Sequence, residues 1–581
     1  MKPPLIRHST AASPSAADDS AFSWARVAEE LGLTPEGPVN IAERAVDRHA
    51  RSAHAGRTAF RFLNADGSHR DISYRELAGL TDRFGNALAA LGVRQGDRVF
   101  VLCGRICELY VAVLGALKIG AVVAPLFPSF GPEPIRSRIA QAGGTVLVTT
   151  TSLYLRKVAA LRPVLPSLQH VLVVDDLGSG PLPGTLDLPT LLQAAADTPA
   201  LAPTGPEDPA LLHFTSGTTG QPKGALHVHA ALLTHYASAR FALDLRPADI
   251  FWCTADPGWV TGTSYGIVAP LVVGATCLVD PSEFDPARWI GILEQERVNV
   301  WYTAPTAIRL LMKAGPALFA GRRFPDLRFI ASVGEALNPE AVRWGQAMLG
   351  RPIHDTWWQS ETGGIMIANT ATRPVKPGSM GRPLPGIRAH VVRHVEGEPV
   401  SRIETPDTVG ELALETGWPA MFRAYLGQPE RYRACFAGTL YLTGDLVRRD
   451  ADGDYWFVGR SDEVIKSSGH LIGASEVESV LMEHPAVAEA GVIGKPDALA
   501  GEVVKAFVVL RDGNAPDDAL NQALLAHARQ RLGAAVAPKE IAFVSALPHT
   551  RSGKIMRRLL KSREVGLPEG DTSTLAQGEE K

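Results

Sequence analysis

The chain has 581 residues, of which 45% are hydrophobic and 20% are charged, with 55 glycines and 43 prolines. These values are ordinary for folded proteins and exclude a collagen, a coiled coil or a wholly disordered chain. Because 58 Lys and Arg residues nearly balance 61 Asp and Glu residues, the net charge of −3 gives no overall attraction to a polyanion. We therefore expect no nucleic-acid partner.

The N-terminal 21 residues contain prolines where a secretion signal needs an apolar run, so they predict a disordered tail. Five cysteines without a CxxC pair favour a reducing compartment, and we expect a cytoplasmic protein. Lys118, Gly120 and Pro125 interrupt the most apolar stretch, residues 110–127. That stretch therefore predicts a buried helix followed by a buried strand, and we expect no membrane partner.

Residues 22–460 alternate helical stretches with short apolar runs such as 98–103, 145–150 and 170–176, which predicts α/β layers with parallel sheets. The Pro- and Gly-rich segments 177–206 and 372–386 predict surface connections. A hairpin at 450–460 precedes a new alternation, which predicts a small α+β domain at 461–563. The remaining residues, 564–581, have few large apolar side chains and predict a second disordered tail. The expected fold is thus α/β, with a large N-terminal and a small C-terminal domain.

The strongest local signal is the Gly-, Ser- and Thr-rich run FTSGTTGQPKG at residues 214–224. Glycines allow close backbone approach and hydroxyls add donors, while Lys223 supplies a positive charge; together these suit a triphosphate. The spacing differs from a Walker A loop because Lys223 precedes a glycine instead of Ser or Thr. An ordinary polar loop is the alternative interpretation of this run alone.

Three other patterns point to different chemistry. The GTSYG run around Ser264 fits a serine-hydrolase elbow, although Pro257 lies in the preceding segment, where a buried strand is needed. The DADGD run at 450–454 has its glycine at the wrong position for a calcium loop and predicts a hairpin turn. His227 and His229 lack a nearby third zinc ligand.

Residues 549–563 carry six basic side chains and no acidic one. A solvated basic face and a nucleic-acid patch are the two general interpretations, and the absence of aromatic residues disfavours stacking on single-stranded bases. Ser552 and Gly553 predict a turn that would project the long cation Lys554 into a separate site.

Taken together, these segments resemble the AMP-forming acyl-CoA synthetases of the adenylate-forming superfamily, and among them the acetate:CoA ligases. The resemblance extends over residues 22–563 and rests on seven motifs in family order: FTSGTTGQPKG, DPGWVTGTSYG, SVGEALNPE, HDTWWQSETGG, YLTGD, GRSDEVIKSSG and TRSGKIMRR. It implies that a short-chain carboxylate, acetate before propionate, attacks the α-phosphate of ATP. The resulting acyl-adenylate then reacts with CoA, and AMP and pyrophosphate leave. Because anion meets anion in the first step, positioning and charge neutralisation must supply the catalysis.

The resemblance assigns the ATP-binding residues. The catalytic cation is Lys554, Ser360 touches the α-phosphate, Asp445 binds the ribose hydroxyls, and Arg460 assists it. Phosphate contacts fall on Thr215, Ser216, Gly217, Thr218, Thr219, Gly220 and Lys223. The adenine lies between two segments, Gly334, Glu335 and Ala336 on one side and Asp355, Thr356, Trp357, Trp358 and Gln359 on the other.

The same resemblance implies Mg²⁺ as cofactor, with ATP and CoA as cosubstrates. Glu361 would bind the magnesium that bridges the phosphates, and a second, structural magnesium would bind the backbone carbonyls of Met482, His484 and Val487. Ser468 and Gly469 would line the CoA tunnel. The small domain would be mobile about a hinge at Asp462, presenting Lys554 for adenylation and then Ser468 and Gly469 for thioester formation.

Trp358 would floor the acyl pocket, with Val260, Thr261 and Val333 as its walls. A buried tryptophan covers about 150–250 Å², which leaves room for a very short acid. Leu471 stands where the family usually has a phosphate-binding arginine, and this departure leaves other small or substituted acids open. Further alternatives are carrier-protein loading, a hydrolase at Ser264 and a nucleotide sensor. A lysine acetyltransferase and a deacetylase acting on Lys554 would be the protein partners, since acetylation removes its charge.

Overall fold

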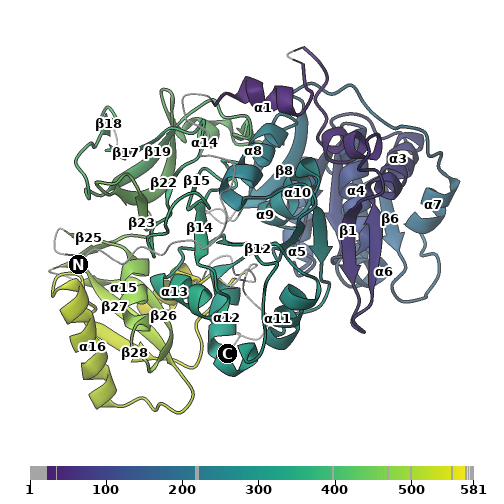
Figure 1. Ribbon diagram of the computed structural model, residues 1–581. Coiled ribbons are helices and arrows are strands. Elements are labelled where there is room, and N and C mark those ends of the chain that lie inside the picture. Colours follow the sequence, from purple (N-terminus) through teal and green to yellow (C-terminus); the bar gives the residue numbers. More distant parts are fainter. Residues whose placement is uncertain are drawn as a thin grey trace.

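The structure is a computed structural model, and it describes residues 22–34, 36–215, 222–395, 398–461, 463–467, 470–497, 500–550, 554–569, 572 and 575. Three sheets with their helices form the large N-terminal part, and a fourth sheet forms the smaller C-terminal part (Figure 1). The mixed α/β fold with a large and a small domain is therefore as predicted. The predicted tail at residues 1–21 lies outside the described residues, and the domain boundary between 460 and 461 stays a prediction.

The first sheet has the strand order β20-β9-β8-β4-β3-β5-β6-β7, and its central strands are parallel. Three of the apolar runs predicted as strands, β3, β5 and β6, lie side by side in it, as expected. The strand bounds are β3 Arg98–Leu102, β4 Val122–Pro125, β5 Val146–Thr150, β6 His170–Val174, β7 Leu186–Asp187, β8 Pro209–Thr215, β9 Lys223–Val228 and β20 Ala424–Tyr425. Its helices include α3 (Tyr74–Ala90), α4 (Cys107–Lys118), α5 (Pro132–Ala142) and α7 (Leu188–Ala194).

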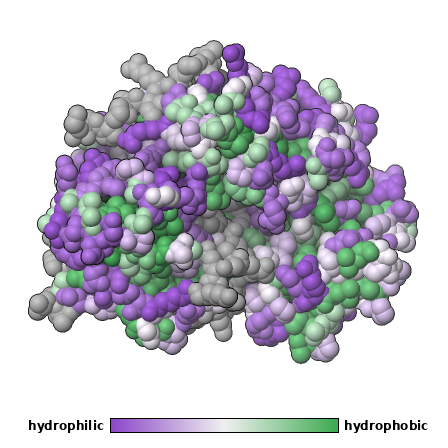
Figure 2. All heavy atoms as spheres, turned by 90° about the horizontal axis from the view of Figure 1, so that it is seen from below, coloured by the Kyte–Doolittle hydropathy of each residue, from purple (hydrophilic) through white to green (hydrophobic). Residues whose placement is uncertain are grey.

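The apolar stretch at 110–127 forms α4 and then β4, which confirms the predicted buried helix and strand. Its lysine, Lys118, is fully buried, and its ammonium donates to Asp47 Oδ1 at 2.7 Å and Asp82 Oδ1 at 2.6 Å. A buried charge needs such partners because it has lost its water. Among the described residues, no helix combines the length and apolarity needed to cross a membrane. The face in Figure 2 shows hydrophilic residues interspersed with hydrophobic ones.

The second sheet has the order β16-β15-β14-β13-β12-β10-β11-β1-β2. Its strands are β1 Thr58–Leu63, β2 His69–Ser73, β10 Ile250–Cys253, β11 Thr276–Val279, β12 Val300–Thr303, β13 Phe329–Ser332, β14 Ile353–Trp357, β15 Ile367–Ala368 and β16 Arg382–Pro383. Its helices include α8 (Ala231–Leu243), α11 (Pro286–Gln295), α12 (Pro305–Ala314) and α13 (Pro339–Met348). β10, β12, β13 and β14 are parallel, so their carboxyl ends meet at one edge.

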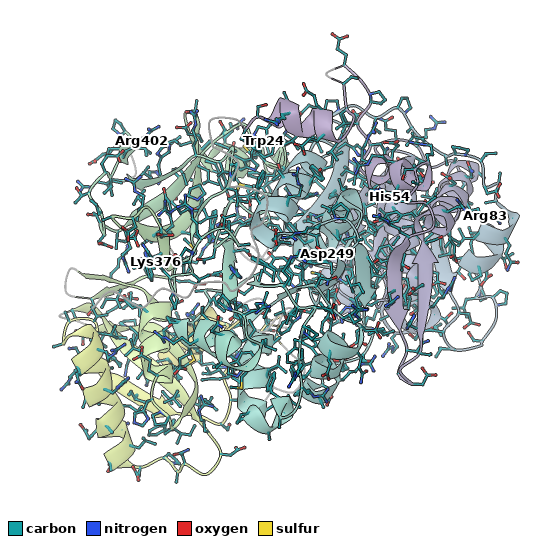
Figure 3. The ribbon with its side chains drawn as sticks, viewed as in Figure 1. Trp24, His54, Arg83, Asp249, Lys376 and Arg402 are labelled. Carbon is teal, nitrogen blue, oxygen red and sulfur yellow. The ribbon has the colours of Figure 1, made fainter. Side chains whose placement is uncertain are left out.

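The third sheet has the order β18-β17-β19-β22-β21, with β23 paired to β22. Its strands are β17 Ala389–Arg393, β18 Ser401–Arg402, β19 Gly410–Glu415, β21 Phe436–Ala437, β22 Leu440–Arg449 and β23 Tyr455–Arg460. The predicted hairpin is confirmed, since β22 and β23 are antiparallel and join through the DADGD turn. The ammonium of Lys376, labelled in Figure 3, lies within 2.7–2.9 Å of the three turn carboxylates, Asp450, Asp452 and Asp454. A side chain of the protein thus supplies the cation for this turn.

The fourth sheet has the order β25-β24-β27-β26, with β28 paired to β27. Its strands are β24 Ile465–Ser467, β25 His470–Ile472, β26 Val487–Asp497, β27 Gly501–Leu510 and β28 Glu540–Phe543, and its helices are α15 (Ala474–Met482), α16 (Asp518–Leu532) and α17 (Arg557–Val565). This is the small α+β unit expected from the sequence. It lies beside α12 and α13 of the second sheet (Figure 1).

One predicted connection is more ordered than expected. Residues 177–206 contain β7 and the helix α7, which the proline content had concealed. Asp187 caps this helix through a hydrogen bond from the Thr190 backbone N–H at 2.9 Å, and Pro189 occupies its first turn. Proline is compatible with a first turn because the backbone N–H it lacks has no partner within the helix there.

Candidate functional site

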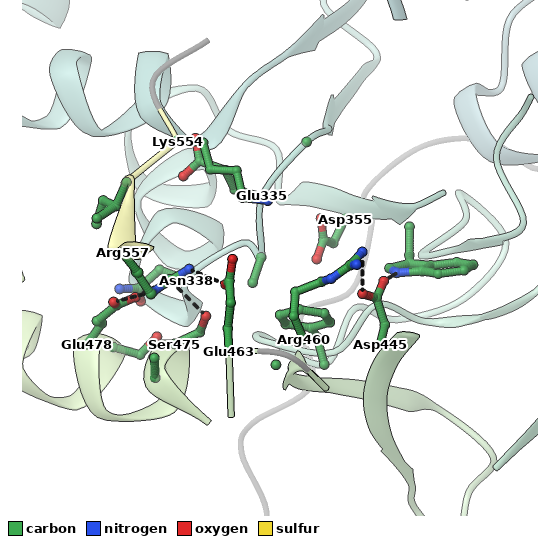
Figure 4. Close-up of a pocket in the computed structure, with 18 of the residues that line it drawn as sticks. Glu335, Asn338, Asp355, Asp445, Arg460, Glu463, Ser475, Glu478, Lys554 and Arg557 are labelled. Atoms are coloured by element: carbon green, nitrogen blue, oxygen red, sulfur yellow. Dashed lines mark hydrogen bonds and ion pairs between the residues drawn. The ribbon is translucent and has the colours of Figure 1, made fainter. Parts of the chain in front are cut away.

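A pocket lies where the small domain faces the second and third sheets (Figure 4). It holds about 1350 Å³ of empty space, part of it open to solvent. Lys554 and Arg557 of the small domain line it together with Asp445 and Arg460 of the large domain. Of the residues predicted to bind the nucleotide, the lining includes Gly334, Glu335, Ala336, Asp355, Thr356, Trp357, Trp358, Gln359, Asp445, Arg460 and Lys554. Gly334 and Lys554, which are 220 positions apart in the chain, thereby line one cavity.

Asp445 is a buried residue of β22 that lines the pocket. Its Oδ2 accepts hydrogen bonds from Trp357 Nε1 at 2.9 Å and Gln359 Nε2 at 3.0 Å. Its Oδ1 lies 3.3 Å from Arg460 Nη1 and has no hydrogen-bond partner among the described residues. Burial raises the pKa of Asp445, while Arg460 and Lys554 oppose this shift. An ionised carboxylate with an unused oxygen can accept hydrogen bonds from ligand hydroxyls.

A further part of the pocket wall is formed by the turn that follows β13. Gly334 has a φ of +98°, a conformation that glycine adopts without strain. Beside it, Glu335 accepts hydrogen bonds from Thr306 Oγ1 at 2.6 Å and from Arg309 Nη2 at 2.8 Å. These contacts fix the turn that was predicted to frame the adenine.

Asp355 lies in the middle of the neighbouring strand, β14, and also lines the pocket. Its carboxylate accepts hydrogen bonds from Ser332 Oγ at 2.9 Å and from the Thr356 N–H at 3.0 Å. Burial raises the pKa of Asp355 to about 7, although these hydrogen bonds oppose the shift. The carboxyl edge of parallel strands is where ligands of α/β proteins usually bind.

The predicted phosphate end of the site begins at the β8–β9 hairpin. Thr215 at the end of β8 pairs with Lys223 at the start of β9. The ammonium of Lys223 lies 5.5 Å from the centre of the Tyr425 ring, and burial together with Arg431 lowers the pKa of Lys223, whereas Glu361 opposes the shift. Tyr425 in turn donates to Glu361 Oε1 at 2.6 Å. The intervening loop, with the predicted contacts Ser216, Gly217, Thr218, Thr219 and Gly220, lies outside the described residues.

Lys554 is held by contacts with residues that precede it in the chain. Its N–H donates to Thr550 Oγ1 at 3.0 Å, its carbonyl accepts from the Thr550 N–H at 2.7 Å, and Ile555 pairs with His549. Three positions later, Arg557 donates through Nε and Nη2 to the two oxygens of Glu478 at 2.9 and 2.7 Å. Glu478 also accepts from the Val492 N–H of β26 at 2.9 Å. The segment that carries Lys554 is thus tied to both α15 and the small sheet.

Trp358, the predicted floor for the acyl group, lines the pocket. Its Nε1 donates to the Tyr302 hydroxyl at 3.2 Å, and its ring meets Tyr265 edge to face with centroids 5.2 Å apart. Val260 and Thr261 begin the helix α9 (Val260–Thr263), and Val333 directly follows β13. Those three predicted wall residues are not part of the pocket lining described above, and their role stays a prediction.

Two of the carbonyls predicted to bind a structural magnesium accept hydrogen bonds within the small domain. The Val487 carbonyl accepts a hydrogen bond from Arg511 Nε at 3.0 Å, and the His484 carbonyl accepts one from the Val487 N–H at 3.0 Å. A backbone carbonyl has two lone pairs, so one hydrogen bond does not prevent it from binding a cation. The magnesium-binding role of Met482, His484 and Val487 stays a prediction. The predicted hinge Asp462 and CoA contacts Ser468 and Gly469 lie outside the described residues, as does the side chain of Leu471.

The other patterns in the sequence have structural roles. Ser264 is buried inside a helical segment rather than at a turn between strand and helix, which disfavours a hydrolase nucleophile. His227 is buried and shares a hydrogen bond with the Ala420 carbonyl at 2.9 Å through Nδ1. Ser360 lies in the irregular segment between β14 and β15 and is half-buried.

Sequence reasoning missed part of the pocket wall, namely Arg309, Asn338, Glu463, Ser475, Glu478 and Arg557. Arg557 lies in the basic segment that the sequence singles out, but nothing in the sequence identifies Glu478 as its partner. Glu478 and Arg309 carry no such signal, since each is one charged residue in an ordinary amphipathic helix.

Comparisons with known proteins agree with this geometry. The pattern of the AMP-binding enzyme family matches residues 46–426, and that of the AMP-binding enzyme C-terminal domain matches residues 476–554. The acetyl-coenzyme A synthetase of Bacillus subtilis (strain 168) is 44% identical over 95% of this chain and 96% of its own length. That of Escherichia coli (strain K12) is 37% identical over 93% of this chain and 86% of its own.

Solved structures show the same fold. A Brucella canis acyl-CoA synthetase superposes with a TM-score of 0.73 at 35% identity, over 94% of this chain and 98% of its own. An anthranilate CoA ligase in complex with anthranoyl-AMP gives a TM-score of 0.82 at 28% identity, over 91% and 98%. Family patterns on both domains, full-length relatives and a shared fold agree, and the chain belongs to the AMP-binding enzyme family.

Proposed function

We propose that this protein ligates acetate to coenzyme A at the expense of ATP, through an acetyl-adenylate, with release of AMP and pyrophosphate. The observation that carries the proposal is the shared pocket of Asp445 and Lys554, which come from the two domains. The names of the full-length relatives, acetyl-coenzyme A synthetase in each case, support the choice of acetate.

The chemistry of adenylation explains why the pocket collects cations. A carboxylate must approach the α-phosphate of a tetra-anionic nucleotide, so uncompensated repulsion would block the bond. In the proposal, Lys554 donates to the carboxylate and α-phosphate oxygens where charge shifts, and Lys223 neutralises the terminal phosphates. Asp445 and Arg460 hold the ribose, and Ser360 contacts the α-phosphate. No protein nucleophile is required.

Glu361 is the proposed ligand for Mg²⁺. Its carboxylate lies in the same cluster as Lys223 and Tyr425, and carboxylate oxygens are the ligands that Mg²⁺ prefers beside phosphates. Bound there, the ion would neutralise phosphate charge. Tyr425 orients the carboxylate by its hydrogen bond to Oε1.

The second step needs a different face of the small domain. We propose that this domain turns about Asp462 after adenylation, removes Lys554 from the pocket, and brings Ser468 and Gly469 beside the entering CoA. The thiolate of CoA then attacks the acyl carbon and displaces AMP. Acetylation of Lys554 by a partner acetyltransferase, reversed by a deacetylase, would stop the first step because it removes the charge. The described cysteines are all free, which supports the proposed cytoplasmic location.

A panel of carboxylates tests the proposal directly. AMP formation, dependent on both ATP and CoA, is measured with acetate, propionate, butyrate, and benzoate. Acetate should give the highest kcat/KM, with propionate about 10- to 200-fold lower for one additional methylene. Trp358→Gly should extend the accepted length beyond propionate. Highest activity with benzoate, or AMP formation independent of CoA, would refute acetate ligation.

A further inference from the structure

Tyr302 is a fully buried residue of β12 whose hydroxyl contacts Trp358, the proposed floor of the acyl pocket. We infer that Tyr302 sets the chain-length limit of this enzyme by locking the Trp358 indole in place. The inference rests on the proposed function, because it assigns a positioning residue to the acyl pocket of that reaction.

The hydrogen bonds around Tyr302 have one consistent direction. An indole nitrogen can only donate, so the Tyr302 oxygen accepts from Trp358 Nε1 at 3.2 Å. The hydroxyl group of Thr356 donates to the Ser332 carbonyl at 2.6 Å, since a carbonyl can only accept. The Tyr302 hydroxyl therefore donates to Thr356 Oγ1 at 3.0 Å. The chain thus starts at the indole and ends on the backbone of β13.

Packing removes the remaining freedom of the indole. Tyr265 meets Trp358 edge to face at 5.2 Å and Tyr302 edge to face at 5.7 Å, so each ring restrains the other two. Tyr265 is itself fixed, because its hydroxyl accepts from the Ile365 N–H at 2.7 Å. Within this cluster, Tyr302 is the residue whose hydroxyl fixes the rotation of the indole about its side-chain bonds.

The position of the indole decides how much space remains for the acid. When the Tyr302 oxygen is removed, the half-buried indole N–H loses its hydrogen-bond acceptor. Turning toward water or the pocket lets the N–H form a new hydrogen bond, so that orientation becomes favourable. A turned indole no longer ends the pocket at the same depth. The expected result is a weaker preference for acetate over propionate and butyrate, with the tryptophan still present.

Tyr302→Phe tests this inference, because it removes one oxygen and keeps the ring. The acetate to propionate ratio of kcat/KM should fall about fivefold or more, the loss expected for one hydrogen bond. The control is Tyr74→Phe, which removes a buried hydroxyl that donates to the Ala275 carbonyl at 2.8 Å, away from the pocket. That variant should keep the wild-type ratio. In a Trp358→Phe background, the Tyr302→Phe change should leave the ratio unaltered.

The ratio separates positioning from stability. If Tyr302→Phe lowers kcat/KM equally for every acid, its hydroxyl serves only the fold and the inference is wrong. If the wild-type enzyme does not prefer acetate, the proposed function fails first, whatever the variant does. Should Tyr302→Phe fail to fold, Thr356→Val removes the acceptor of the Tyr302 proton and allows the same comparison; an unchanged ratio there would overturn the inference.

Discussion

At the scale of single residues, the pocket places the buried carboxylate of Asp445 near two cations, Arg460 and Lys554. Asp445 is buried, and burial alone would favour its neutral form. Arg460 and Lys554 act in the opposite direction and favour the carboxylate. Because Lys554 arrives from another domain, the charge balance around Asp445 depends on where the small domain lies.

Replacing Lys554 with Gln removes the cation and keeps a side chain of similar length. Adenylation, measured as exchange of pyrophosphate into ATP with acetate present, should fall about 10²- to 10³-fold because a positioned charge is lost from the transition state. Thioester formation from synthetic acetyl-AMP and CoA should remain near the wild-type rate. Lys561→Gln, in the same basic segment but paired with Glu502, is the matched control. An undiminished exchange rate would remove Lys554 from the mechanism.

At the scale of elements, the turn between β22 and β23 shows why local sequence was insufficient. The DADGD run predicted a hairpin turn, and the structure confirms it. Its counter-ion, Lys376, lies 74 positions earlier in a segment predicted only as an irregular connection. Such a long-range pairing leaves no periodic signal, and neither does the contact between Arg309 and Glu335.

Helix α17 begins at Arg557, three residues after Lys554. Arg557→Gln should reduce pyrophosphate exchange by about tenfold or more, because the bidentate contact to Glu478 no longer fixes the start of the helix. Thioester formation from acetyl-AMP should decrease less. The control is Arg563→Gln on the same helix, whose partner Glu569 is exposed. Equal losses in both half-reactions would show that Arg557 supports only the fold of the small domain.

The strands and helices of the core were largely predictable, since the spacing of apolar residues along each segment indicates a strand or a helix locally. Strands β3, β5 and β6 followed from apolar runs, and the small α+β unit followed from its own alternation. Helix α7 did not, because Pro189 and the glycines around it conceal a short helix. For the site, the resemblance placed the residues around Asp445 and Lys554, whereas the partners that orient them required three-dimensional contacts.

At the scale of the whole molecule, buried imidazoles link stability to acidity. Burial lowers the pKa of His49, His227, His229 and His235 to about 4. In the unfolded chain these rings have a pKa near 6.5, so between pH 6.5 and 4 the unfolded state binds more protons. Stability is therefore lost as the pH falls through that window.

His229→Gln should reduce this acid sensitivity. His229 accepts a hydrogen bond from the Ile41 N–H through Nδ1 at 3.2 Å, and a glutamine oxygen can accept the same bond. The free energy of unfolding, from urea titrations at pH 7 and pH 5, should fall by about 2 kcal/mol less in the variant than in the wild type. An identical fall in both proteins would mean that His229 is protonated in the folded state.

The two-sided construction of the pocket has a kinetic consequence. Lys554, Ser475 and Arg557 face Asp445 and Glu335 across the seam between the domains, so the nucleotide is enclosed by parts that belong to separate sheets. In the proposed cycle the two domains have to separate and come together again once for each acetate consumed. Where this motion limits turnover, solvent viscosity sets the rate. We then expect kcat to decrease in proportion to the viscosity of the buffer when sucrose is added.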